Sequence, residues 1–260
     1  TKKQSENIKK QYGKFDIITA NHVCAHVENL NDFFKGVQNL LKEDGLFVFE
    51  ISYRASVLKK NTFDTIYHEH LDYHALYPIS KFVKKFNLSV FDYKTPNAQG
   101  GSLRVYTSNN RNAKIRKSVK KQIIKEKNIF NLFNKNTYKK FENKIINCKY
   151  KLHVIIQDCI KKNMSIAGYG AAAKTTTFLN YFEIPEKNIE FIIDDNKLKQ
   201  GLCIPGTKIK ILSPSKLNKK KIDLLIIFAW NYAEIIIKKN KKFKKRGGKF
   251  LIPFPQPKLI

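Results

Sequence analysis

Two apolar runs flank a helical pattern near the start of the chain, and together they restrict its fold more than any other feature. Residues 15–20, FDIITA, and residues 46–52, LFVFEIS, are short apolar runs of the kind that form buried strands. Between them, residues 30–42 carry apolar side chains at helical spacing, and an acidic pair before Gly45 ends that helix. A strand, a helix and a second strand in this order form a crossover unit, which joins parallel strands. The sequence therefore predicts an α/β fold with a parallel sheet.

The end of the chain carries another series of strands and helices. Residues 165–170, SIAGYG, predict a strand that runs into a glycine turn, and residues 171–182, AAAKTTTFLNYF, predict a helix. The run 189–195, IEFIIDD, is a second strand, and later apolar runs supply more strands. Between the two halves, residues 113–162 have apolar groups three or four positions apart, which predicts a helical connector. We therefore expect two α/β halves joined by helices.

The segment between the first half and the connector has weaker patterns. Residues 53–66 show no regular period, and we expect them to be irregular. Residues 78–88, PISKFVKKFNL, predict a helix with proline near its start. The runs 89–97 and 102–108 predict a strand pair around two glycines.

The chain is strongly basic, with a formal net charge of +29. Such an excess first suggests a nucleic-acid partner. However, the lysines are spread along the chain as pairs on apparent helix faces, few aromatic side chains interleave with them, and no RNP, zinc-finger or helix-turn-helix pattern occurs. We interpret the charge as a lysine-rich composition and expect no nucleic-acid partner.

Compartment and membrane association follow from two further observations. No run approaches the about eighteen apolar residues that a membrane span needs, so we expect no membrane partner. The four cysteines, at positions 24, 148, 159 and 203, form no CxxC pair. They are typical of small buried hydrophobic residues in a reducing cytoplasm.

Residues 66–76, IYHEHLDYHAL, crowd three histidines with acidic and phenolic groups. Two of the histidines are four positions apart, which suits a metal, but Asp72 stands where an HExxH motif has its second histidine. A polar loop without chemistry is a second interpretation. A proton-transfer site is the third, because Tyr67, Glu69 and His70 bring together a phenol, an orienting carboxylate and an imidazole. We favour the third and expect no metal.

Residues 20–27, ANHVCAHV, directly follow the first predicted strand. Side chains just past the carboxyl end of a parallel strand line the ligand crevice of an open α/β sheet. His22 and His26 are therefore candidates for the site, although either could equally be an ordinary loop or core histidine.

Residues 168–176, GYGAAAKTT, allow three interpretations. As GxGxxA after a strand, the stretch resembles a dinucleotide fingerprint, with Asp194 at the end of the next strand as the ribose acid. It is also a near miss to a phosphate loop, in which Ala173 replaces the last glycine and its Cβ obstructs the wrap around phosphate. The third interpretation is a tight turn without a ligand. A helix N-terminus with glycines and Lys174 still suits a phosphate group.

Five stretches occur in one order along the chain: YHEHLDYHAL, GGSLRVY, GYGAAAKTTTFLNY, IDDNKLKQGLCIPGTKIKI and FAWNYAEII. Together they resemble the S-adenosylmethionine-dependent C-methyltransferases of deoxysugar biosynthesis, over essentially the whole chain. The resemblance implies methyl transfer to a carbon of a keto-sugar that is linked to a nucleoside diphosphate, here expected to be dTDP. The carbon is activated as an enolate, and S-adenosylmethionine is the cofactor.

The resemblance also implies a domain organisation. Residues 1–108 correspond to the C-terminal part of a class I, Rossmann-like methyltransferase domain, and residues 109–260 to a second Rossmann-like α/β domain with a helical lead-in over 109–163. The family's cysteine-rich zinc module and its glycine-rich cofactor loop do not precede GKFDIITA. We therefore expect an N-terminally incomplete chain that is inactive alone and binds sugar nucleotide better than S-adenosylmethionine. The full-length protein is expected to be a cytoplasmic monomer.

The resemblance assigns roles to individual residues. His70 is expected to act as the base or as the partner of the enolate oxygen, with Tyr67 in the complementary role. Glu69 would orient these groups or bind a sugar hydroxyl, and His26 would assist them. The residues expected to bind the sugar nucleotide are His22, Gln99, Gly100, Gly101, Arg104, Gly168, Gly170 and Lys174.

Two alternatives stay open. The first is an NAD-dependent oxidoreductase built on the C-terminal half, with Asp194 on the ribose. The second is a non-catalytic protein that binds a sugar nucleotide.

The charge interpretation makes a testable prediction. Duplex DNA should bind weakly, without sequence preference, and should be released at about 0.15 M salt, because only exposed, screened charges are involved. Fluorescence anisotropy in a salt titration measures this. Tight binding with a clear preference for one sequence at that salt would contradict the interpretation.

Overall fold

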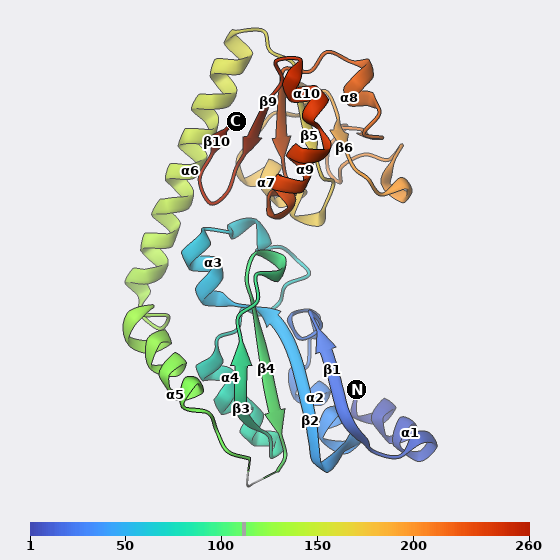
Figure 1. Ribbon diagram of the computed structural model, residues 1–260, viewed down its shortest axis with the longest axis vertical. Coiled ribbons are helices and arrows are strands. Elements are labelled where there is room, and N and C mark those ends of the chain that lie inside the picture. Colours follow the sequence, from blue (N-terminus) through green and yellow to red (C-terminus); the bar gives the residue numbers. More distant parts are fainter. Residues whose placement is uncertain (111–112) are drawn as a thin grey trace. The chain divides into compact units, whose positions relative to one another are not determined.

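The computed structural model describes residues 1–110 and 113–260, which divide into two units (Figure 1). Unit 1 comprises Thr1–Lys59 and His68–Lys139, and unit 2 comprises Lys60–Tyr67 and Lys140–Ile260. The chain therefore leaves unit 1 for one short segment, returns to it, and enters unit 2 again within a long helix. The domain boundary expected between residues 108 and 109 stays a prediction. Residues 111–112 of the expected helical lead-in lie outside the described residues.

Unit 1 is built on a four-stranded sheet with the order β1-β2-β4-β3. Strands β1 and β2 are parallel, and β4 runs antiparallel to both of its neighbours. The predicted crossover and the predicted strand pair are thereby confirmed. The strands are β1 (Phe15–Asn21), β2 (Leu41–Ser52), β3 (Ser89–Lys94) and β4 (Ser102–Ser108).

Strand β1 differs from its prediction in burial. It was expected to be a buried strand, but it lies at the edge of the sheet and Ile17 is 61% exposed. An edge strand has a neighbour on one side only, which leaves more of it in solvent. Strand β2 also begins earlier than predicted, because the residues around Gly45 continue it through a register irregularity opposite Phe15 and Ile17.

Helices of unit 1 cover the sheet, and Phe34 of α2 packs edge-on against Phe47 and Phe49 of β2. The prediction that residues 53–66 are irregular was wrong, since they contain α3 and a 3₁₀ turn. The helices are α1 (Lys2–Tyr12), α2 (Leu30–Leu40), α3 (Arg54–Lys60), α4 (Leu76–Phe82) and α5 (Lys117–Ile124). Short turns of helix are η1 (Cys24–His26), η2 (Phe63–Thr65), η3 (Val83–Phe86), η4 (Ala98–Gly100) and the π-helical η5 (Lys125–Ile129).

The carboxylate of Glu126 is fully buried inside unit 1. It accepts hydrogen bonds from the Tyr53 hydroxyl at 2.8 Å and from the backbone N–H groups of Leu76 and Tyr77 at 2.7 and 2.8 Å. Those N–H groups belong to the first turn of α4, where a helix has no internal acceptors for them. Burial and this neighbouring carboxylate both raise the pKa of Tyr53. Glu126, which lies in η5, therefore caps α4 and joins it to Tyr53, the residue after β2.

Unit 2 has a six-stranded sheet with the order β10-β9-β8-β5-β6-β7. All neighbours pair in parallel except β10, which is antiparallel to β9. The strands are β5 (Ile166–Tyr169), β6 (Ile192–Ile193), β7 (Ile211–Leu212), β8 (Leu224–Ile227), β9 (Lys249–Ile252) and β10 (Lys258–Leu259). The helices are α6 (Lys135–Lys161), α7 (Ala173–Tyr181), α8 (Lys216–Lys219), α9 (Ala233–Lys239) and α10 (Lys241–Lys245), with 3₁₀ turns η6 (Glu186–Asn188), η7 (Lys197–Lys199) and η8 (Trp230–Tyr232).

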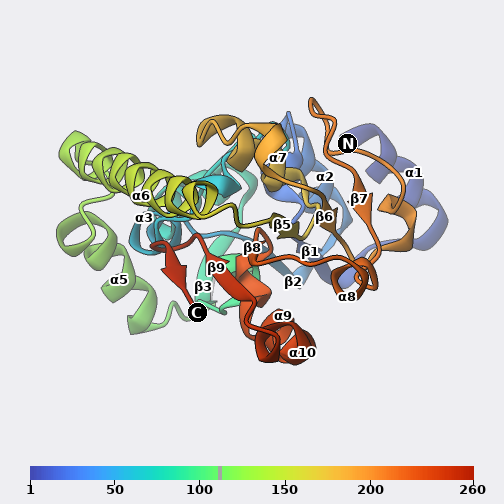
Figure 2. The same cartoon turned by 90° about the horizontal axis from the view of Figure 1, so that it is seen from above.

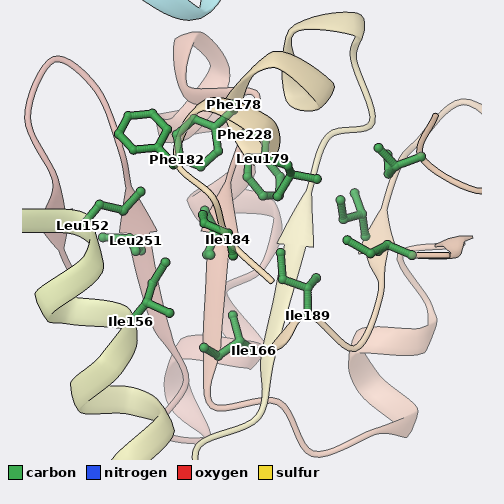
Figure 3. Packing of buried hydrophobic residues seen from close by; sticks show 14 of the residues in the cluster. Leu152, Ile156, Ile166, Phe178, Leu179, Phe182, Ile184, Ile189, Phe228 and Leu251 are labelled. Atoms are coloured by element: carbon green, nitrogen blue, oxygen red, sulfur yellow. The ribbon is translucent and has the colours of Figure 1, made fainter. Parts of the chain in front are cut away.

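Both faces of this sheet are covered by helices. Helices α6 and α7 lie on one face, and α9 and α10 lie on the other (Figure 2). Successive residues of β8 enter different cores, with Leu224 packed in the first and Leu225 in the second. Figure 3 shows the first core, in which Leu152 and Ile156 of α6 face Leu251 of β9. A strand such as LLII is apolar on both faces, so it is stable only in a sheet that helices cover on both sides.

Three cysteines are buried, but Cys203 is exposed, so the expectation of burial was wrong for that residue. In the part of the chain that the structure describes, no helix is both long and apolar enough for a bilayer.

The Glu126 network predicts a loss of stability when its charge is removed. In Glu126→Gln, an amide NH₂ must face a backbone N–H of α4, so one bond is lost and a donor is left buried. We expect the free energy of unfolding, measured by urea denaturation, to fall by about 2–3 kcal/mol. Glu142→Gln, at an exposed position of α6, is the matched control and should change little. Equal effects of the two substitutions would contradict the assignment.

Candidate active site

The structure brings His26 and His70 together in unit 1. His26 ends the turn η1 that follows β1, and its ring centroid lies 5.0 Å from that of His70. His26 Nδ1 is 2.7 Å from the backbone oxygen of Glu69, and the Leu71 N–H donates to the Ala25 oxygen at 2.8 Å. These backbone bonds hold the 68–71 loop against η1. A carbonyl only accepts, so Nδ1 of His26 carries the proton and a neutral ring keeps a lone pair on Nε2.

The other members of the histidine-rich stretch are divided between the units. Tyr67 belongs to unit 2 and is half-buried, whereas Glu69 belongs to unit 1. The Glu69 carboxylate lies 3.9 Å from Nε2 of the exposed His68. His74 pairs with Tyr53 through a backbone bridge, and burial lowers the pKa of its ring. His74 is therefore a neutral structural histidine.

A second polar cluster in unit 1 joins His22, Glu50 and Arg104. The Glu50 side chain is buried, and its Oε2 accepts from Arg104 Nε at 2.8 Å and lies 2.7 Å from Nη2. Its Oε1 lies 3.4 Å from Nε2 of His22, whose φ of 54° is unusual for a residue other than glycine. Hydrogen bonding to Glu50 raises the pKa of Arg104.

Strand pairing explains why these three residues meet. Arg104 lies directly opposite Glu50 in the β2–β4 ladder, and His22 follows β1 on the other side of β2. Sequence reasoning selected His22 and Arg104 but missed Glu50. The sequence indicated Glu50 only as a single charged residue inside the apolar run LFVFEIS.

Gln99, Gly100 and Gly101 form the tight turn that leads into β4. All three have positive φ, at 49°, 87° and 129°. The Gly101 N–H donates to the Ala98 oxygen at 2.8 Å, and the Gly101 oxygen accepts from the N–H of Tyr53. The turn therefore needs its glycines, and it precedes Arg104 by a few residues.

In unit 2, the glycine turn after β5 is closed by an internal carboxylate. Gly170 has φ 99°, and a Cβ there would meet Ala229 at 2.7 Å. The Asp194 carboxylate accepts from the N–H groups of Ala171 and Asn196, both within 2.8 Å. Gly168 admits Phe228 and Ile192 of the core, because a Cβ would approach them to within 2.5 and 2.8 Å. Both glycines thus have packing roles. Asp194 accepts hydrogen bonds from the turn itself, whereas the dinucleotide alternative requires this carboxylate to bind a ribose.

Lys174, the expected phosphate ligand, is held inside unit 2. Its Nζ lies 3.6 Å from Oδ2 of Asp64, donates to Asn231 Oδ1 at 3.1 Å, and lies 4.5 Å from the ring centroid of Trp230. The Trp230 indole Nε1–H donates to the same Asp64 oxygen at 2.6 Å. Sequence reasoning missed Asp64, whose signal was an acidic residue in the otherwise uncharged run NTFDTIY.

Burial sets the protonation tendencies of this pair. Desolvation raises the pKa of Asp64, and the nearby Lys174 and the Trp230 hydrogen bond partly offset that rise. Desolvation lowers the pKa of Lys174, and Asp64 partly offsets that fall. Each charge therefore depends on the other to persist in the interior.

Within residues 1–110 and 113–260, no three or more His, Cys, Asp or Glu side chains are arranged to hold a metal ion.

Known proteins match the chain over both units. Residues 97–255 match the model of the C-methyltransferase C-terminal domain, and residues 1–92 match that of a methyltransferase domain. The C-methyltransferase NovU of Streptomyces niveus is 30% identical over 261 residues, a match that covers all of this chain and 62% of NovU. The chain thus spans less than two thirds of that relative. With the first match extending over more than half of the chain, and with the Rossmann-like α/β architecture described above, this protein belongs to the C-methyltransferase family.

Proposed function

We propose that this protein transfers a methyl group from S-adenosylmethionine to a carbon of a keto-deoxysugar linked to a nucleoside diphosphate. Membership of the C-methyltransferase family supports methyl transfer to carbon. The packing of His26 on His70 is the observation that carries the chemical proposal, because it places two imidazoles side by side at the carboxyl end of a parallel strand.

The chemistry requires a base and an oxyanion partner. A ketone beside the accepting carbon makes the proton on that carbon removable, as the sugar becomes an enolate. His70 acts as the base or as the partner of the enolate oxygen, and Tyr67 takes the complementary role. Glu69 contributes its backbone oxygen to His26, and its carboxylate binds a sugar hydroxyl or orients the other groups. His26, with Nδ1 protonated, offers Nε2 as an auxiliary acceptor.

Polar residues of unit 1 support a sugar-nucleotide ligand. Arg104 and His22 share the buried Glu50, so the guanidinium and the imidazole are held in place before a ligand arrives. The turn Gln99–Gly101 presents backbone close to Arg104. In unit 2, we include the turn at Gly168 and Gly170 among the proposed ligand-binding residues because its glycines keep the backbone free of side chains.

S-adenosylmethionine supplies an electrophilic methyl group on a positively charged sulfur. The carboxyl end of β1 fits such a cofactor by position and polarity, since Asn21 is exposed and the His22 side chain is 33% exposed. The positive φ of His22 turns the backbone out of the extended path of the strand at this point.

We also propose that the protein acts in the cytoplasm, as a monomer when full length. Four free thiols support a reducing compartment.

The catalytic assignment predicts the effect of removing each group. In the complete protein, His70→Ala should lower the rate of methyl transfer by about 10²–10⁴-fold, because a proton-transfer group is lost, and Tyr67→Phe should lower it strongly as well. Transfer of labelled methyl to a dTDP-keto-sugar measures the rate, and circular dichroism checks folding.

His68→Ala is the matched control, because it removes the same ring from the same loop at a side chain that is 82% exposed. It should leave the rate nearly unchanged. Near-normal turnover by His70→Ala would contradict the assignment.

A ligand comparison separates the proposed function from the oxidoreductase alternative. Thymidine diphosphate at saturating concentration should raise the melting temperature of this chain, because a ligand that binds only the folded state stabilises it by mass action. NAD should not, since Asp194 is engaged by the turn. Stabilisation by NAD alone would favour the oxidoreductase.

A further inference from the structure

A short segment of the chain is buried inside unit 2, far in sequence from the rest of that unit. Residues 61–64 are all buried. The ring of Phe63 packs against Tyr181 at 4.6 Å, Phe182 at 5.4 Å and Phe254 at 5.7 Å, measured between centroids. Apolar packing of this kind attaches the segment to the unit but does not by itself fix its orientation.

A polar clamp at Asp64 supplies the orientation. The carboxylate is 1% exposed, and its Oδ2 is held by the indole N–H of Trp230 and by the ammonium of Lys174. Lys174 is in turn fixed by Asn231. Trp230 and Asn231 belong to η8 and Lys174 to α7, so two separate elements of unit 2 define the position of one carboxylate. The bond from Trp230, at 2.6 Å, is short and directional, whereas the Lys174 ammonium, at 3.6 Å, acts mainly through its charge.

The chain between Asp64 and Tyr67 is itself ordered. Residues Phe63–Thr65 form the 3₁₀ turn η2. The Ile66 N–H donates to the Phe63 oxygen at 2.8 Å, and the Thr65 hydroxyl donates to the Thr62 oxygen at 2.7 Å. Tyr67 follows directly, so a change of the segment at Asp64 is passed along the turn to the Tyr67 backbone.

We propose that Asp64 is a positioning residue for the reaction: through Trp230 and Lys174 it locks segment 61–67 to unit 2 and so fixes Tyr67 for its chemical role. The inference rests on the proposed function, in which Tyr67 takes part in proton transfer or binds the enolate oxygen. Placement matters there, because a small displacement of a catalytic group can cost about a hundredfold in rate.

The clamp can be observed separately from catalysis. Trp230 is the single tryptophan of the chain, so its emission reports this one contact. Asp64→Asn keeps the size of the side chain and an acceptor for the indole N–H, but it removes the charge that pairs with Lys174. Its emission maximum should differ from that of the wild type, because a neutral amide replaces the carboxylate charge beside the indole. Asp158→Asn is the matched control, since Asp158 forms an exposed pair with Lys162 in the same unit, and its emission should equal that of the wild type.

The kinetic test uses the complete protein and a double-mutant cycle. Asp64→Asn should lower kcat at least tenfold and leave KM for S-adenosylmethionine within twofold, whereas Asp158→Asn should change neither. If Asp64 acts through Tyr67, the double variant Asp64→Asn/Tyr67→Phe should be no slower than Tyr67→Phe alone. A merely structural role would instead add its loss to that of Tyr67→Phe.

The outcomes are distinct. An additive loss in the double variant, or a normal kcat in Asp64→Asn together with the shifted emission, overturns the positioning role and leaves the proposed function standing. Failure of the wild type to transfer methyl overturns the proposed function and this inference with it. If Asp64→Asn does not fold, Trp230→Phe removes the same N–H donor while keeping an aromatic ring, and it should show the same kcat loss and the same lack of additivity.

Discussion

A carboxylate taken out of water needs a hydrogen-bond donor or a positive charge beside it, and this constraint acts in both units. Glu50, Asp64 and Glu126 are all buried. The partners of each come from elements distant in sequence: strand β4 and the residue after β1, helix α7 with the turn η8, and the first turn of α4. Apolar packing would tolerate several arrangements of these elements. A buried charge tolerates few arrangements, because an arrangement without its partner leaves the desolvation cost of the charge uncompensated.

The fold was predictable where local pattern and tertiary packing agree. The crossover β1–α2–β2, the strand pair β3–β4 and the series of strands and helices in unit 2 all follow from apolar patterns. The errors arose where long-range packing decides. Residues 53–66 looked irregular because the segment contributes to two cores, with Ala55 of α3 packed in unit 1 and Phe63 packed in unit 2. Strand β1 is as apolar as a central strand, yet its place at the sheet edge exposes Ile17.

The candidate site shows the same division. The position after a strand pointed to His26, the Tyr-x-Glu-His motif pointed to His70, and their rings do meet. Glu50 and Asp64 could not be inferred, because a single acidic residue in an apolar stretch does not reveal which cation or donor will bind it. Their partners are 54 residues away for Arg104 and 166 residues away for Trp230. Spacing along a chain identifies local chemistry, whereas these pairings exist only once the sheets are assembled.

The interleaving of the two units also affects how the protein is made. A ribosome releases residues 60–67 long before the segments that bury them, because Trp230 follows Asp64 by 166 residues and Phe254 comes later still. Phe63 and Asp64 therefore stay exposed until those segments emerge. Unit 2 cannot close before its later segments have joined this early one. A nascent chain with such a delay is a natural client for chaperones that shield apolar segments.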